Sequence, residues 1–187
     1  MGFIDRQPSI IIRALGATDY ICLAALGTAE RSPITMEDVV AAVDALAAPL
    51  WVPVFDMVFD TVTDLVERGC LNSDPRAETF SLTGIGRRRL MDLLSQPIQT
   101  PMSGFGQVGV RLKLAFLHIL PPILRRHQII AIIRAYECEM AACSARCKAW
   151  RLNGPMGQRW LDHQMDALED GLDLLRRLAR EAEPKLG

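Results

Sequence analysis

The stretch Leu65-Val66-Glu67-Arg68-Gly69-Cys70-Leu71, followed by Phe80-Ser81-Leu82-Thr83-Gly84-Ile85-Gly86-Arg87, decides the fold that we predict. In the first segment a helical apolar pattern stops at Gly69, and glycine commonly follows the last turn of a helix. In the second segment Thr83 stands where a helix N-cap is expected. Between them lie two short extended pieces, residues 70–73 and 78–82, on either side of the turn sequence Asp74-Pro75-Arg76-Ala77. The pattern therefore predicts a helix, a two-stranded hairpin and a further helix.

Upstream of this hairpin, the spacing of apolar residues predicts three helices. The first covers residues 18–29, and the second begins after the N-cap Thr35 and ends near Pro49. The third starts with Pro53 as a first-turn proline. We expect its apolar face to consist of Phe55, Val58, Phe59, Val62, Leu65 and Val66. Three helices followed by a two-stranded wing predict a mainly α protein with a winged helix-turn-helix domain over residues 1–96, N-terminal extension included.

Downstream, residues 96–104 are rich in helix breakers and predict a linker. Two long amphipathic helices are expected after it, over residues 122–150 and 159–183, separated by Gly154-Pro155. Two such helices cannot bury their apolar faces alone, so we expect residues 105–187 to form a helical hairpin that pairs with a second copy of the chain. The alternative is that the hairpin folds back onto the N-terminal domain.

The chain has 187 residues, of which 50% are apolar and 23% charged, as in an ordinary globular domain. Its formal net charge of −1 excludes a globally basic nucleic-acid binder, but not a locally basic surface. Residues 17–95 contain six Arg and twelve acidic residues, whereas residues 96–187 contain thirteen Lys or Arg and nine acidic residues. No apolar run is long enough to span a bilayer and the first residues lack a signal-peptide pattern, so we expect a cytoplasmic protein without a membrane partner.

Three segments together resemble the PadR-like family of bacterial transcriptional regulators. Residues 65–71 resemble the end of the family's recognition helix, and residues 80–87 resemble the exit from its wing. Residues 112–122, Leu-Lys-Leu-Ala-Phe-Leu-His-Ile-Leu-Pro-Pro, are similar to the opening of its C-terminal domain. The resemblance implies a homodimeric regulator, expected to be a repressor, that binds double-stranded DNA at a promoter palindrome and senses a small aromatic effector.

The predicted DNA contacts lie on the wing, on the following helix and on the recognition helix. They are Arg76, Arg87, Arg88, Arg89, Thr61, Asn72 and Ser73. The expected outer face of the recognition helix departs from the family because it carries Asp56, Asp60 and Asp64, and carboxylates oppose phosphate contact. Two alternatives to DNA binding therefore stay open. The first is a protein-interaction module that has lost DNA recognition, and the second is a small-molecule-binding protein.

Three tryptophans, Trp150, Trp160 and Trp51, are candidates for an effector site because flat rings between helices can hold an aromatic molecule. The alternative is ordinary interface packing. Cys138, Cys143 and Cys147 are spaced to lie close together on one helix, which suits a thiolate metal site or redox switch, although packing explains them more simply. No catalytic, nucleotide-binding or zinc motif is present in the sequence, so we expect no enzyme, no metal and no cofactor.

Overall fold

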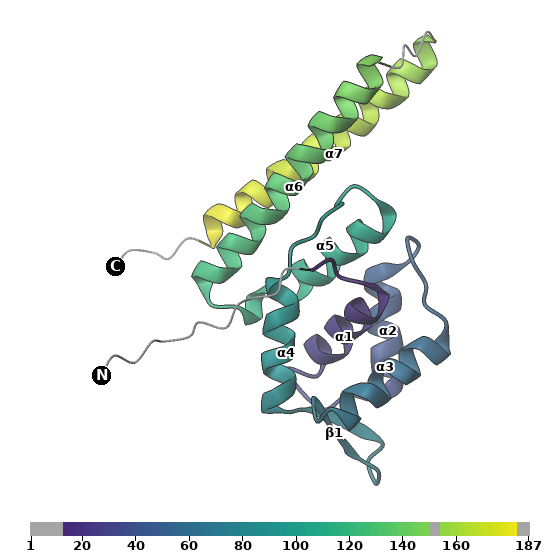
Figure 1. The fold of residues 1–187 in the computed structure, drawn as a ribbon, viewed down its shortest axis with the longest axis vertical. Helices are drawn as coiled ribbons and strands as arrows, with labels where there is room; N and C mark the ends of the chain where they lie inside the picture. The colour runs from purple at the N-terminus through teal and green to yellow at the C-terminus, as the bar shows by residue number, and fades with distance from the viewer. Residues whose placement is uncertain (1–12, 150–153, 183–187) are drawn as a thin grey trace, which may run out of the picture.

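A computed structural model describes residues 13–149 and 154–182, and its architecture confirms the mainly α prediction with a two-stranded wing (Figure 1). The elements, in chain order, are α1 (Ala17–Thr28), α2 (Met36–Ala47), α3 (Phe55–Glu67), β1 (Leu71–Asp74), β2 (Thr79–Leu82), α4 (Gly84–Ser95), α5 (Gly104–Phe116), the 3-10 helix η1 (Leu117–Ile119), α6 (Pro122–Ala149) and α7 (Pro155–Glu181). The elements from α1 to α5 form the winged-helix part, and α6 and α7 form a long hairpin beside it.

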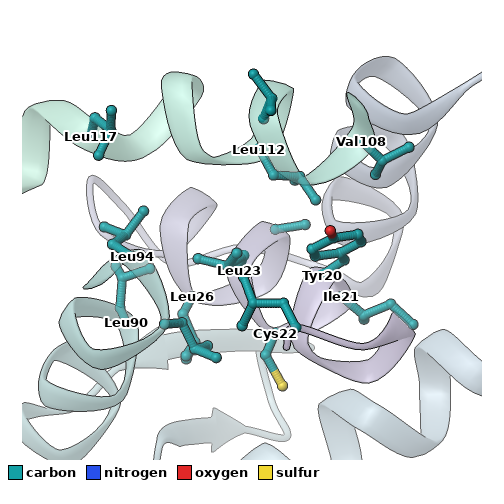
Figure 2. Packing of buried hydrophobic residues seen from close by; sticks show 14 of the residues in the cluster. Tyr20, Ile21, Cys22, Leu23, Leu26, Leu90, Leu94, Val108, Leu112 and Leu117 are labelled. Carbon is teal, nitrogen blue, oxygen red and sulfur yellow. The ribbon is translucent and has the colours of Figure 1, made fainter. Parts of the chain in front are cut away.

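Helix α1 is the centre of the winged-helix core. Nine of its twelve residues are buried, and α2, α3, α4 and α5 all pack against it. Figure 2 shows Leu23 and Leu26 of α1 lying between Leu90 and Leu94 of α4 and the apolar side of α5. A helix that is apolar all round must be enclosed on every side, which is why four helices surround it.

Local signals around the wing behave as predicted. Thr35 caps α2, since its hydroxyl accepts the Asp38 N–H at 3.2 Å while the Asp38 carboxylate accepts the Thr35 N–H at 2.8 Å. Gly69 ends α3 with a φ of +68°, a conformation that glycine adopts without strain. Thr83 accepts the Gly86 N–H at 3.0 Å and donates its hydroxyl to the Gly69 carbonyl at 2.6 Å. This residue therefore joins the start of α4 to the end of α3.

The wing is an antiparallel pair of strands in which Leu71 lies opposite Leu82 and Asp74 opposite Thr79. A further bridge joins Phe80 of β2 to Ile34, just before α2, with N–H···O distances of 2.9 and 2.7 Å. The base of the wing is thus fixed to the helix-turn-helix, and only its turn projects.

Two expectations for α3 were wrong. Pro53 lies outside the helix, which begins at Phe55 after the N-cap Val54. Phe55 and Phe59 are 59% and 50% exposed, whereas the buried face consists of Val58, Thr61, Val62 and Leu65. These four positions follow the i, i+3, i+4, i+7 spacing of one helical face, and that face packs on α1.

The breaker-rich segment 96–104 is packed and does not behave as a free linker. Gln96 and Ile98 are 7% and 6% exposed, and Ser103 caps α5 by accepting the Gly106 N–H at 2.9 Å. Helix α5, which the sequence did not predict, packs against α1 and α2. The winged-helix part therefore extends through α5 before the chain turns into the hairpin.

The hairpin consists of α6 and α7 packed along each other, with Arg176 of α7 bound to Glu137 of α6 at 2.9 Å. Helix α7 begins four residues earlier than predicted because Pro155 is accommodated in its first turn. Helix α6 lies against the winged-helix part through contacts with α4 and η1, and Glu139 in its middle accepts the Met102 N–H at 2.7 Å. Neither these helices nor the other described ones combine the length and apolarity needed to cross a membrane.

Lys113 of α5 is fully buried where α4, α5 and α6 meet. Its ammonium group donates to the Gln96 carbonyl and, at 2.8 Å, to Gln128 Oε1 of α6. Gln128 in turn donates to the Ser95 carbonyl at the end of α4, with an N–O distance of 3.1 Å. Burial without a carboxylate partner in these hydrogen bonds lowers the pKa of Lys113 to about 7.

This buried lysine makes stability depend on pH. Its folded-state pKa lies below the ordinary value of 10.5, so the unfolded chain binds more protons above pH 7 and the free energy of unfolding rises with pH. We expect wild type to gain about 1.5 kcal/mol over Lys113→Met between pH 7.0 and 8.5, measured by denaturant unfolding. Identical pH dependence of the two proteins would contradict the assignment of a low pKa to Lys113.

Candidate nucleic-acid interface

The wing presents the first group of predicted DNA contacts, Asn72 and Ser73 on β1 and Arg76 in the turn. Asn72, Ser73 and Arg76 are all exposed. The Asp74 carboxylate accepts the backbone N–H groups of Arg76 and Ala77 at 2.9 and 3.4 Å, which orders the turn around the arginine. Exposed polar side chains on an ordered, projecting turn are suited to contact a nucleic-acid backbone.

The three consecutive arginines of α4 do not form one cationic group. Arg88 is exposed and has no ion pair with any described residue. Arg87 is exposed but bound to Glu30 at 2.9 Å, and Arg89 reaches Asp19 of α1 at 3.3 Å. Consecutive helical residues point about 100° apart, so only Arg87 and Arg88 are available to a ligand at the surface.

Arg89 is one of two arginines that pair with the buried carboxylate of Asp19. The Asp19 carboxylate accepts two hydrogen bonds from Arg13, at 2.6 and 2.5 Å, and one from the Gly16 N–H at 2.9 Å. Burial alone would raise the pKa of Asp19, but the hydrogen bonds from Arg13 and Gly16 outweigh it and lower the pKa. Asp19 is therefore ionised inside the fold, and Arg89 serves as a structural counter-ion.

Thr61 was predicted as a DNA contact, and this was wrong. It is 4% exposed, and its hydroxyl donates to the Met57 carbonyl at 2.7 Å. Thr61 stands on the buried face with Val58 and Leu65, but apolar residues cover more than one face of α3, so spacing alone did not reveal this.

The outer face of α3 is acidic and apolar. Asp56 and Asp60 are exposed beside Phe55 and Phe59, whose rings lie 6.4 Å apart. Asp64, the third predicted acid, is bound to Arg68 at 2.7 Å and is only half exposed. Two carboxylates without an ion pair to any described residue thus occupy the face that normally enters the major groove.

One cationic residue was missed by the sequence analysis. Arg31, in the turn after α1, is exposed and lines a hollow of about 300 Å³ together with Arg87, Ser81 and Thr83. No sequence signal could have found it, because the turn that contains Arg31 is brought to the wing by the long-range bridge between Ile34 and Phe80.

The proposed effector tryptophans lie in different parts of the molecule. Trp51 packs edge-on against Tyr20 of α1 and Phe105 of α5, with ring centroids 6.3 and 5.6 Å apart. Trp160 is 64% exposed in the first turns of α7, at the end of the hairpin that points away from the winged-helix part. Trp150 lies outside the described residues, so an effector site that uses these rings stays a prediction.

The cysteine cluster does not assemble into a metal site in the described part of the chain, where no group of His, Cys, Asp or Glu side chains is arranged to hold an ion. Cys138 is exposed and Cys143 is half-buried on α6. The side chain of Cys147 lies outside the described residues.

The family model of AphA-like transcriptional regulators matches residues 13–179. The chain belongs to this family, which confirms the expectation of a regulator of the PadR-like type and not an enzyme. Comparison with functionally described proteins found no match.

Among solved structures, Bacillus subtilis PadR is similar at 14% identity and a TM-score of 0.41, over 92% of this chain and 100% of that one. The same protein in complex with operator DNA gives 14% identity and a TM-score of 0.37, over 87% and 99% of the two chains. A PadR-like regulator from Bacillus cereus gives 16% identity and 0.38, over 87% and 97%.

The arginines of α4 have separable roles. We expect Arg89→Ala to lower the free energy of unfolding by about 1 kcal/mol, because buried Asp19 loses one of its cationic donors. Arg88→Ala should change it by less than about 0.5 kcal/mol, as for other exposed positions. Denaturant unfolding of the two variants beside wild type measures both, and equal losses would refute the distinction.

Proposed function

We propose that this chain is a DNA-binding transcriptional regulator that acts as a homodimer. The observation that carries the proposal is the winged-helix fold in a chain that belongs to a family of transcriptional regulators. A dimer with two winged-helix parts fits a palindromic promoter site, and occupancy of such a site represses transcription.

DNA contact in this proposal is made from the wing and the adjoining arginines. Arg76 lies on the projecting turn of the wing. Arg31 and Arg87 line a hollow near the exit of the wing, and exposed Arg88 follows them on α4; we call these three residues the arginine edge. Ser81 lines the same hollow as Arg31 and Arg87, together with Glu30, which is paired with Arg87. Arginine and hydroxyl donors on a concave edge are the groups that contact phosphate oxygens in protein–DNA interfaces.

Helix α3 contributes less than is usual for a recognition helix. Asp56 and Asp60 repel phosphate, while an aspartate can accept a hydrogen bond from a cytosine amino group. The electrostatic part of the affinity for DNA must therefore come from Arg76 and the arginine edge. Helix α3 contributes only a preference for particular bases.

Dimerisation is proposed through the outer side of the hairpin. Helix α7 exposes a second stripe, Met156, Trp160, Ala167, Gly171 and Leu174, which is distinct from the residues that pack on α6. The intervals of four, seven, four and three residues place these side chains on one helical face. The stripe is apolar except for exposed His163 beside the Trp160 ring, and it has no partner inside the described residues, which fits the packing of a second hairpin against it.

The DNA-binding proposal predicts that the affinity for DNA falls strongly with salt and that Arg76 and Arg88 contribute to this dependence. We expect tight, sequence-selective binding to the intergenic DNA upstream of the gene that encodes this chain, measured by fluorescence anisotropy at two salt concentrations. Arg76→Ala or Arg88→Ala, present in both subunits, should each reduce the slope of log affinity against log salt by about 2. Arg89→Ala is the matched control, with an unchanged slope. Binding to a scrambled duplex as tight as to the upstream DNA, or no binding at low salt, would refute the proposal.

The dimer proposal predicts that a charge in the α7 stripe separates the subunits. We expect Leu174→Glu to shift the mass measured by light scattering from dimer to monomer, because a buried, unpaired carboxylate is costly in an apolar interface. Asp166→Lys, an equally drastic change at an exposed α7 position outside the stripe, is the control and should stay dimeric. A wild-type monomer, or a dimer in both variants, would rule out this interface.

A further inference from the structure

A second exposed apolar surface surrounds the start of α3. We call it the α3 patch; it consists of Val52, Phe55 and Phe59, which line two adjoining hollows. Their exposed fractions are 66%, 59% and 50%. Exposed apolar side chains gathered on one surface of a soluble protein commonly mark a binding site for another molecule.

The α3 patch borders two hollows of similar size. One, of about 600 Å³, lies between α2 and the start of α3 and is lined by Val40, Val43, Val52, Phe55 and Val58, among others. The other, of about 610 Å³, lies between α3 and the wing and is lined by Phe55, Phe59, Pro75, Phe80 and neighbouring residues. Met36 and Phe55 line both, so a ligand that covers Phe55 can place an apolar group on either side of it.

Carboxylates surround both hollows. Glu37 lines the two of them, Asp44 lines the first and Glu78 lines the second. Asp56 and Asp60 are exposed on the neighbouring surface of α3. Among the described residues that line either hollow there is no lysine or arginine. The surface therefore combines apolar hollows with a negative rim.

We propose that the α3 patch is a docking site for a basic segment of another protein that carries large apolar side chains. Each hollow accepts an apolar side chain, while lysines or arginines of the segment pair with Glu37, Asp44 and Glu78. An arginine or lysine can also lie over the exposed rings of Phe55 and Phe59, where cation–π attraction adds to the charge pairing.

Charge selects this occupant over others. Phosphates of DNA and anionic lipid headgroups are repelled by the rim carboxylates, and apolar hollows offer them few donors. A second copy of the chain, docked patch to patch, would bring two acidic surfaces together, which complementary interfaces avoid. A basic segment with apolar anchors matches both properties of the surface. This function goes beyond DNA binding and uses different residues from the arginine edge.

The test is a selection of random twelve-residue peptides displayed on phage against the full-length protein, followed by synthesis of the enriched peptides. We expect them to have a net charge of at least +3 and two or more large apolar residues. Fluorescence anisotropy should show at least tenfold weaker binding to Phe55→Ser/Phe59→Ser. Binding to Glu37→Gln/Asp44→Asn should be weaker by three- to tenfold. Ile85→Ser, at an apolar α4 position 50% exposed like Phe59, is the matched control and should bind as wild type.

Several outcomes overturn the proposal. The first is that no enriched peptide depends on Phe55 and Phe59 for binding. The others are enrichment of acidic peptides and equal binding by all variants. A change of oligomeric state in Phe55→Ser/Phe59→Ser would show instead that a second copy covers the patch. Arg76→Glu/Arg88→Glu separates the two functions, because it should lose DNA affinity and keep peptide binding.

Discussion

The burial of α1, where nine of twelve residues are enclosed, is the constraint on which the rest of the structure depends. Apolar residues lie on all sides of this helix, so four helices must surround it. The approach of α5 is close because a Cβ at Gly27 would lie 2.6 Å from the Phe116 ring. Since α5 is needed to close this core, η1 and α6 leave from the surface of the winged-helix part at a fixed point. Lys113 and Gln128 reinforce that point with hydrogen bonds that join α5 and α6 to the end of α4.

Features set by neighbouring residues were predictable, and those set by distant contacts were not. The caps at Thr35 and Thr83 and the glycine at Gly69 are local, and all three were confirmed. Helix α5 was missed because its glycines disfavour a helix. The structure needs Gly109, where a Cβ would lie 2.2 Å from the Tyr20 hydroxyl. The site at Lys113 was equally invisible, because its partners come from two other elements.

The candidate site shows the same division. A charged residue in a turn is exposed wherever the turn lies, so the exposure of Arg76 followed from sequence. The arginines of α4 point in three directions, and only the fold decides that one of them meets buried Asp19. On α3, apolar residues cover more than one face, so periodicity could not tell that Thr61 is inside and Phe59 outside.

The outer face of α3 is explained by neither water nor DNA. Exposure to water favours polar side chains on this face, but Phe55 and Phe59 are apolar. Contact with phosphate favours cationic side chains, but Asp56 and Asp60 are anionic. A partner that is both apolar and basic satisfies the two requirements at once. Pairing of the hairpins would give each dimer two such surfaces. A partner that has two basic segments, or that is itself a dimer, would then bind more tightly, because the first contact raises the effective concentration for the second. Weak docking at one surface is then compatible with stable recruitment by the dimer, and the basic segment is held close to the arginine edge without competing for its charge.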